Sequence, residues 1–303
     1  MPLETIEQMV ADARAGGYAI GYFESWNVES LQGVIDAAES SRSPLIVGFN
    51  GDFLARPDRL AAERLDWYGA LGRAAAGSAS VPCGFIFNEC PDDDWVRRAV
   101  VSGFNLVMPA DPSASFEEST RRVAAITRFA HDHGVAVEAE LGVLPCGAGE
   151  EEGHASSLTD PDQAARFVEA TGVDLLAVSV GNVHIRLEGQ GELDLDRLRR
   201  IAGKVPCGLV LHGGTGIESE SLLLAVGLGV VKVNFGTYLK QHYLAAVRAK
   251  LAAGVSDPHR LLGIGGPDDL MVAGRLAVRD AVLERIGLLG SAGKARPSTP
   301  RED

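Results

Sequence analysis

Residues 208–236 read GLVLHGGTGIESESLLLAVGLGVVKVNFG and contain one complete strand–helix–strand unit. The apolar runs 208–213 and 230–236 have the length of buried strands, and the segment 218–225 between them has the length of a short helix. Strands joined through a helix run parallel, because the helix returns the chain to the end where the first strand began. This unit therefore predicts a parallel sheet covered by helices.

The same alternation extends along the whole chain of 303 residues. Further runs of strand length occupy 18–23, 44–49, 83–88, 106–109, 136–141 and 175–181, and helix-length segments occupy 28–41, 59–76, 92–102, 116–133, 161–171, 194–202 and 238–251. Eight strands and eight helices in alternation predict α/β class and, most simply, a (β/α)8 TIM barrel. A doubly wound open sheet is the alternative. We expect extra C-terminal helices between 257 and 289, a single domain over 1–290 and a flexible tail over 291–303.

Composition limits the partners. The chain has 28 basic and 41 acidic residues, a net charge of −13, which disfavours nucleic acid and anionic membranes as partners. No apolar run approaches the ~20 residues that span a bilayer, and the N-terminal segment is not that of a signal peptide. The four cysteines are scattered without a CxxC pair, which is typical of reduced thiols. We therefore expect a cytoplasmic protein that acts on a small molecule.

The residues that close the strands are the candidate site, because the active site of such a barrel lies at the carboxyl ends of its strands. Five of the predicted strands end in polar or glycine-rich segments, which are 88–90, 138–142, 181–184, 212–216 and 234–237. Two histidines and several carboxylates are therefore predicted to meet at one rim.

His184 and His212 each close a strand and suggest a divalent metal site, since neutral imidazole suits zinc and related ions. Two separate hydrogen-bonded histidines are the alternative. A catalytic zinc site needs a third protein ligand, and Glu89 is the best-placed candidate. Such a set also suits manganese, iron or cobalt. Cys90 is either a softer ligand or a small buried residue.

The segments after the last two strands resemble an anion cradle, in which glycines let backbone N–H groups approach a phosphate. The candidate phosphate-binding residues are Gly213, Gly214, Thr215, Asn234, Gly236 and Thr237. Barrels often bind phosphate in these two loops. The alternative is that the glycines only make tight turns.

The segment 145–157 is long, acidic and rich in glycine. Loops of this kind can close over a substrate and carry a catalytic acid or base. Glu150, Glu151 and Glu152 are candidates for that role, and a solvated run of charge is the alternative reading.

Several segments, in the right order, resemble the class II (metal-dependent) fructose-bisphosphate and tagatose-bisphosphate aldolases. They are VEAELG at 137–142, GVDLLAVSVG at 172–181, LHGGTG at 211–216, VKVNFGT at 231–237 and GSAGKA at 290–295. The resemblance extends from Gly17 to Lys294. It implies a (β/α)8 barrel that uses zinc or a similar ion, cleaves ketose phosphates and forms a homodimer or homotetramer.

The resemblance also assigns roles to residues. It places His184 and His212 on two metal-ligand positions, and Gly213, Thr215, Asn234 and Thr237 on the phosphate-binding loops. Glu140 matches the glutamate of the family's Ala-Glu-Leu-Gly segment. The cluster 150–152 falls in the region of the family's mobile catalytic loop.

The departures from the family lie on the rim. Where the family has Asp-His after the third strand, a proton-transfer residue and a metal ligand, this chain has Asn88-Glu89. An amide has no pKa usable for proton transfer, whereas Glu89 can still bind a metal. Glu24 replaces the asparagine after the first strand, Ile185 replaces a glycine, and 110–112 replace an Asp-x-Ser segment. A retained scaffold with a changed rim predicts a changed substrate or reaction.

We therefore expect an aldolase-like, metal-dependent carbon–carbon lyase acting on a phosphorylated sugar or related ketose other than fructose bisphosphate. Its catalytic candidates are Asn88, Glu89, Glu140 and Glu151. An isomerase, an epimerase or a non-aldol lyase on the same barrel is the alternative, as is a non-catalytic relative that binds a sugar phosphate.

Overall fold

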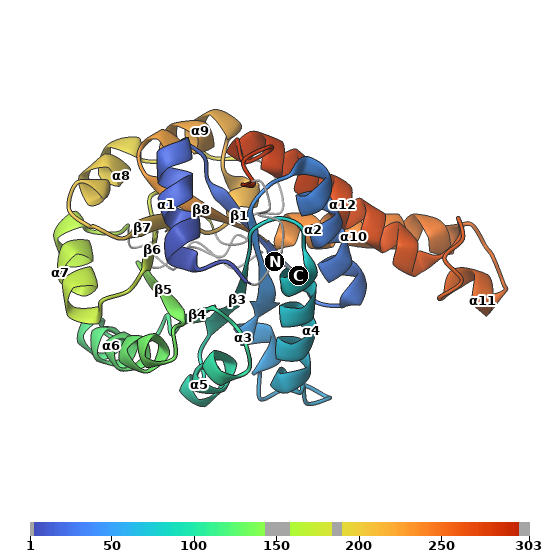
Figure 1. The fold of residues 1–303 in the computed structure, drawn as a ribbon, viewed down its shortest axis with the longest axis horizontal. Coiled ribbons are helices and arrows are strands. Elements are labelled where there is room, and N and C mark those ends of the chain that lie inside the picture. The colour runs from blue at the N-terminus through green and yellow to red at the C-terminus, as the bar shows by residue number, and fades with distance from the viewer. Residues whose placement is uncertain (1–2, 143–157, 184–189, 297–303) are drawn as a thin grey trace, which may run out of the picture.

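The computed structural model describes residues 3–142, 158–183 and 190–296. Its centre is a closed barrel of parallel strands in sequence order, with β8 pairing back onto β1 (Figure 1). The strands are β1 (Ile20–Glu24), β2 (Leu45–Asn50), β3 (Cys83–Cys90), β4 (Leu106–Pro109), β5 (Ala136–Leu141), β6 (Leu175–Val178), β7 (Gly208–Leu211) and β8 (Val230–Phe235). The predicted TIM barrel is confirmed, and the open doubly wound sheet is wrong.

Helices surround the barrel as the alternation predicts. They are α1 (Ile6–Gly16), α2 (Val28–Ser41), α3 (Gly51–Leu54), α4 (Leu65–Ser78), α5 (Asp93–Val101), α6 (Phe116–Asp132), α7 (Pro161–Thr171), α8 (Leu195–Ala202), α9 (Ser219–Gly227), α10 (Thr237–Ala252), α11 (Pro258–Leu261) and α12 (Leu270–Leu289). A short 3-10 helix, η1, spans Gly214–Gly216.

One predicted helix begins later than expected. The segment predicted as a helix over 59–76 becomes helical only at Leu65, and the four-residue α3 precedes it. Asn50 caps α3 by accepting a hydrogen bond from the Phe53 amide. Pro57 lies between the two helices, and proline disfavours helical geometry in the residue before it, so the chain resumes its helix beyond the proline.

Alternate residues of each strand point into the barrel or out to the helices. The interior cluster includes Ile20, Ile46 and Ile86, and Ile6 and Met9 of α1 join it. The outward residues, such as Val47 and Phe87, pack with the helices in a second and larger cluster. The interior is therefore a packed core, and room for chemistry remains at the ends of the strands.

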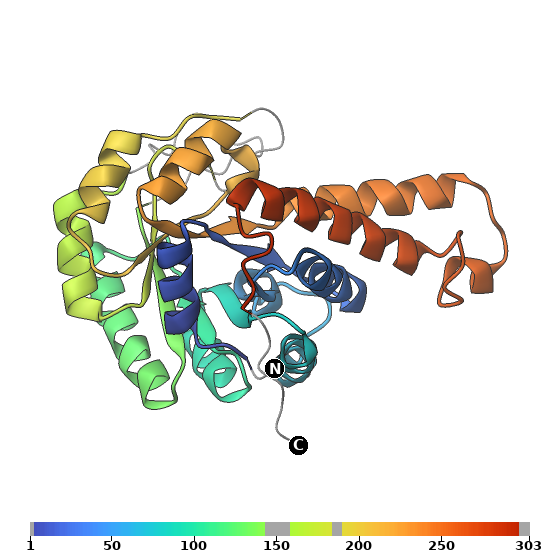
Figure 2. The same cartoon turned by 45° about the horizontal axis from the view of Figure 1, so that its top comes forward.

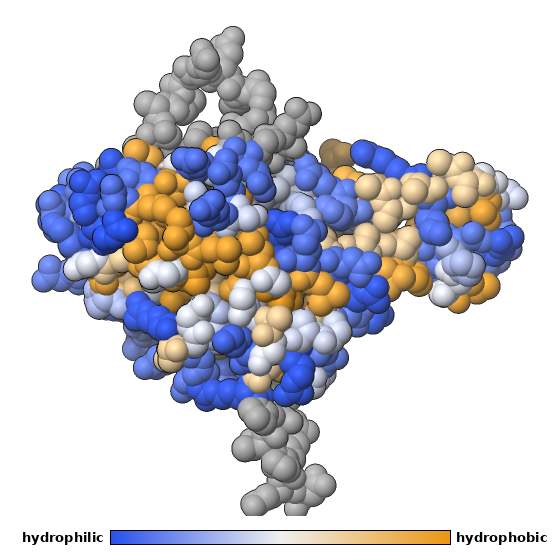
Figure 3. All heavy atoms as spheres, turned by 90° about the horizontal axis from the view of Figure 1, so that it is seen from above, coloured by the Kyte–Doolittle hydropathy of each residue, from blue (hydrophilic) through white to orange (hydrophobic). Residues whose placement is uncertain are grey.

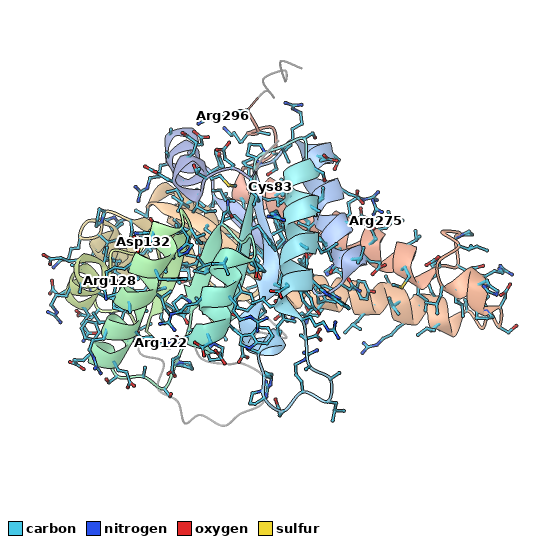
Figure 4. The ribbon with its side chains drawn as sticks, turned by 60° about the horizontal axis from the view of Figure 1, so that its bottom comes forward. Cys83, Arg122, Arg128, Asp132, Arg275 and Arg296 are labelled. Atoms are coloured by element: carbon cyan, nitrogen blue, oxygen red, sulfur yellow. The ribbon has the colours of Figure 1, made fainter. Side chains whose placement is uncertain are left out.

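The C-terminal helices form an arm that projects from the barrel. In Figures 1 and 2, α10 and α12 run side by side away from the body, and α11 lies near the tip. At its base α12 is held to α2 by Arg275, whose guanidinium contacts Asp36 at 2.6 and 2.7 Å (Figure 4). Gly293 and Ala295 donate backbone hydrogen bonds to Ser41 and Arg42, so the predicted tail is packed at least as far as residue 295.

No helix among residues 3–142, 158–183 and 190–296 is long and apolar enough to cross a membrane.

Candidate active site

The strand ends enclose a cavity of about 310 Å³ at the predicted rim. Eight of the residues proposed from sequence line it, namely Asn88, Glu89, His212, Gly213, Thr215, Asn234, Gly236 and Thr237. Gly214 is buried at the start of η1 instead. A neighbouring cavity of about 290 Å³ is lined by Glu89, Glu140 and Arg122 of α6, a residue labelled in Figure 4. Glu89 therefore stands between the two cavities.

The His212 imidazole is the point on which three strands converge. It follows β7, and its side chain is 1% exposed. Its Nδ1 lies 3.1 Å from Glu89 Oε1, on β3, and 3.5 Å from Glu140 Oε1, on β5. Its Nε2 lies 2.9 Å from Glu138 Oε1. One ring nitrogen thus faces two carboxylates at the cavity wall, and the other is held from inside the barrel.

Glu89 reaches this position through an irregular backbone. Its φ is +54°, in the left-handed region, and the register of β3 against β4 shifts between Phe87 and Cys90. Successive residues of a regular strand point to opposite faces, but a bulge re-aims one of them. Asn88 and Glu89 can therefore both face the cavity. Backbone of this kind costs roughly 1–3 kcal/mol and occurs most often at functional sites.

Asn50 fixes the other oxygen of this carboxylate. Its Nδ2 donates to Glu89 Oε2 at 2.9 Å, and both side chains are largely buried. Because metal-binding carboxylates are usually held by such a second hydrogen bond, this contact suits Glu89 to a ligand role.

A charged pair inside the barrel, Glu138 with Lys232, was not predicted from the sequence. Lys232 Nζ lies 2.8 Å from Glu138 Oε2 and 2.5 Å from Asn234 Oδ1, and both charged residues are 0% exposed. The pair could have been inferred from the charged residues within the apolar runs 136–141 and 230–235, since such residues are seldom buried without a partner.

Glu138 is held in its ionised form. Burial by itself raises the pKa of Glu138, but Lys232 and then His212 outweigh burial and bring that pKa below its ordinary value. An ionised carboxylate on Nε2 orients the imidazole, as carboxylates behind metal-binding histidines do.

His212 is protonated when no metal is bound. Burial lowers its pKa, but the hydrogen bond with Glu138 and the charges of Glu140 and Glu89 outweigh burial and raise the pKa to about 10. The cluster then holds three carboxylates against two cations, His212 and Lys232. Exchanging the imidazole proton for a divalent ion would neutralise the remaining negative charge, because a metal-binding imidazole must be deprotonated.

The donor types around His212 Nδ1 are those found in divalent metal sites. An imidazole nitrogen and two carboxylate oxygens face one another, and these are the ligand types of zinc, manganese, iron and cobalt sites. In the described parts of the chain, no group of three or more His, Cys, Asp or Glu side chains is placed so that it could hold a metal ion. The predicted ligand His184 and the predicted catalytic residues Glu150, Glu151 and Glu152 lie outside the described residues.

Cys90 lies away from this centre. Its thiol is buried in the outer core and contacts the Asp92 carbonyl at 3.4 Å, and burial raises its pKa to about 12. A protonated thiol in that position is a packing residue, which favours the second of the two sequence interpretations.

Three polar atoms of the first cavity are buried and find no hydrogen-bond partner within the part of the chain that the structure describes. They are Tyr22 Oη, Asn88 Oδ1 and Asn234 Nδ2. Buried polar groups are normally paired, so unpaired ones at a cavity wall indicate where a ligand supplies the partner.

Comparison with known proteins agrees with this architecture. The family model described as fructose-bisphosphate aldolase class-II matches residues 4–294. The chain therefore belongs to the class II fructose-bisphosphate aldolase family, whose members are generally metal-dependent and act on phosphorylated sugars.

Two relatives show how far this chain has diverged. It is 34% identical over 285 residues to the uncharacterized protein YdjI of Escherichia coli K12, covering 94% of this chain and 96% of the relative. It is 30% identical over 302 residues to the fructose-bisphosphate aldolase of Geobacillus stearothermophilus, covering 97% and 99%. The crystal structure of the YdjI aldolase matches with a TM-score of 0.80 at 33% identity, over 98% of this chain and 100% of that one. The family resemblance seen in the sequence is confirmed, and an aldolase-type lyase is supported.

Proposed function

We propose that this protein is a metal-dependent carbon–carbon lyase that cleaves or forms an aldol bond in a phosphorylated sugar or related ketose other than fructose bisphosphate. The observation that carries the proposal is the convergence of Glu89 and Glu140 on His212 Nδ1, at the wall of a rim cavity of an aldolase-family barrel.

A divalent ion, zinc first and manganese, iron or cobalt as alternatives, would be held by His212, Glu89 and, from the resemblance, His184. When bound, it would act as a Lewis acid on the substrate carbonyl. Glu138 keeps the His212 ring oriented through Nε2, and Asn50 keeps the Glu89 carboxylate in place. His212 and Glu89 thus each have a supporting partner on another strand.

Proton transfer falls to Glu140 in this proposal. Its side chain is 25% exposed against 11% for Glu89, and both line the second cavity. A carboxylate with solvent access can take a proton from a substrate hydroxyl and return it to product. Asn88, which cannot transfer a proton, would hold a substrate hydroxyl through its buried Oδ1. Glu151 remains a candidate acid or base from the sequence alone.

Fructose bisphosphate is disfavoured because Asn88 stands where the family has its proton-transfer aspartate. The base therefore acts from a different strand, and a base in a new place suits a substrate whose reacting hydroxyl is placed differently.

The test is cleavage of a panel of ketoses and ketose phosphates by the purified protein, before and after a chelator. We expect cleavage of at least one, loss of activity with the chelator, and recovery on adding back a divalent metal. Glu140→Gln should lower kcat at least ~100-fold, the usual contribution of a general acid or base. Glu220→Gln, at an exposed position on α9, is the matched control. Activity that survives the chelator, or cleavage of none of the panel, contradicts the proposal.

An isomerase or epimerase is the second candidate, favoured by two carboxylates around one imidazole nitrogen. Such a site could remove a proton from carbon and return it without breaking a carbon–carbon bond. Solvent deuterium found in recovered substrate, with no cleavage product, would favour this candidate over the lyase.

We also propose a homodimer or homotetramer that uses the projecting arm. Leu244 and Leu251 of α10 are 46% and 54% exposed, and Leu262 and Ile264 near the tip are 56% and 66% exposed. Figure 3 shows apolar surface on the body and along the arm. Exposed apolar surface on a long projecting element supports contact with a second copy of the chain.

A further inference from the structure

We propose that Glu24 closes the anion cradle at the start of α10, so that the part of the substrate lying there is an uncharged polyol and not a phosphate. This inference rests on the proposed function. It narrows the substrate class to ketoses that place hydroxyl groups, and no phosphate, against Glu24. It also gives a reason for the replacement of the family's asparagine by Glu24 at the end of β1.

The pairing of β1 with β8 brings Glu24 to the cradle. Tyr22 is opposite Asn234 and Phe23 is opposite Phe235, so Glu24 lies beside Gly236. A Cβ atom on Gly236 would stand 2.3 Å from Glu24 Oε2. The carboxylate therefore lies against the backbone at the start of α10, in space that only a glycine at 236 leaves open.

The positive features at the start of α10 are already matched by this carboxylate. Helix α10 has 16 residues, no acidic residue in its first turn and no side-chain cap at Gly236. Its amino end therefore favours a negative group, and Glu24 supplies one. Lys240, one turn further along, places Nζ 2.5 Å from Glu24 Oε1.

This ion pair is held in place. Glu24 is 7% exposed. The Lys240 ammonium also lies 4.3 Å from the centre of the Phe53 ring and 5.8 Å from that of Trp26. Both charged groups line the same cavity as His212 and Glu89. A phosphate entering from that cavity would meet Glu24 as a like charge.

A second observation indicates what the cavity binds instead. Tyr22 Oη, Asn88 Oδ1 and Asn234 Nδ2 are buried, belong to neutral side chains and have no partner among the described residues. Two can donate a hydrogen bond and one accepts, which suits hydroxyl groups, since a hydroxyl does both. Asn234 adjoins the cradle, so the polyol would extend from the His212 centre toward Glu24. A repulsive group against one ligand beside neutral partners for another is a usual basis of specificity.

The test is binding of inorganic phosphate, followed by phosphorus NMR, to the wild type and to Glu24→Gln and Glu24→Asn. Each titration is repeated with EDTA, and only binding that survives EDTA is counted, so that phosphate on a metal ion does not contribute. We expect at least ~10-fold tighter binding by both variants than by the wild type, since a removed like charge is worth at least that factor. Glu220→Gln, which removes a charge from an exposed position, should bind like the wild type.

Phosphate binding by the wild type as tight as by Glu24→Gln would overturn the proposal, and so would the absence of binding by both variants. Thermal unfolding of each variant checks that it folds. If one substitution harms folding, phosphate binding by the wild type and by the other variant still decides between the two outcomes. Because binding is measured without turnover, this result is separate from that of the cleavage panel. If no ketose of the panel is cleaved but the Glu24 variants bind phosphate more tightly than the wild type, the proposed lyase is rejected and the role of Glu24 is retained.

Discussion

At the scale of single residues, the site depends on charged side chains that are paired inside the barrel. The Lys232 ammonium is fully buried and contacts Glu138, which in turn holds His212. Removing one partner of a buried pair leaves the other charge without compensation, which costs far more than losing a surface pair.

Lys232→Met should therefore lower the free energy of unfolding by about 3–5 kcal/mol, measured by urea denaturation. The matched control is Lys204→Met, which breaks the exposed ion pair with Asp162 and should cost at most about 1 kcal/mol. Similar losses for the two variants would show that the pair in the barrel is not the stabilising contact described above.

His212 makes the stability of the metal-free protein depend on pH. Its folded-state pKa is raised to about 10, above the ordinary value of about 6.5. The stability that the protonated His212 contributes is therefore fully present below about pH 6.5 and is lost as the pH rises through about 10.

The thermal stability gap between EDTA-treated wild type and His212→Gln should thus shrink between pH 6 and pH 10. A gap that stays constant or widens over this range would contradict the protonated imidazole.

At the scale of elements, the alternation of strands and helices could be predicted from the sequence because buried parallel strands are continuous apolar runs. The bulge that turns Glu89 toward the cavity was not readable, since its left-handed φ depends on pairing with β4. The sequence did identify Asn88-Glu89 as the unusual strand end, and both residues line the cavity. It missed the Glu138–Lys232 pair and the contact of Glu24 with Lys240, because these partners come from different strands and helices and meet only when the barrel closes.

The contact between β2 and β3 allows a direct test of barrel packing. A Cβ on Gly48 would stand 2.0 Å from the Ile86 carbonyl oxygen, a backbone atom that cannot move aside alone. Gly48→Ala should cost about 1–3 kcal/mol of unfolding free energy, as overpacked cores do. Gly227→Ala is the control, because a Cβ there meets nothing within 4 Å and alanine favours a helix. Equal stability of the two variants would contradict this packing.

At the scale of the whole molecule, the structure consists of the barrel and a projecting arm formed by α10, α11 and α12 (Figures 1 and 2). One side of α10 packs along α12, and Leu244 and Leu251 are among the exposed residues of its other side.

Replacing Leu244 and Leu251 together by Asp should convert the proposed oligomer to a monomer, measured as molar mass by light scattering after size-exclusion chromatography. Leu60→Asp, at a fully exposed site, should leave the mass unchanged. A wild type that is already monomeric, or a double variant of unchanged mass, would rule out this interface.

We propose that Glu89 and His212 together hold the catalytic metal of this aldolase-family barrel. A crystal structure of the metal-loaded protein, with diffraction recorded at the absorption edge of the metal, tests it most directly. We predict an anomalous peak about 2.0–2.2 Å from both His212 Nδ1 and a Glu89 carboxylate oxygen. A peak elsewhere, or Glu89 beyond hydrogen-bonding distance of a metal on His212, would contradict the claim.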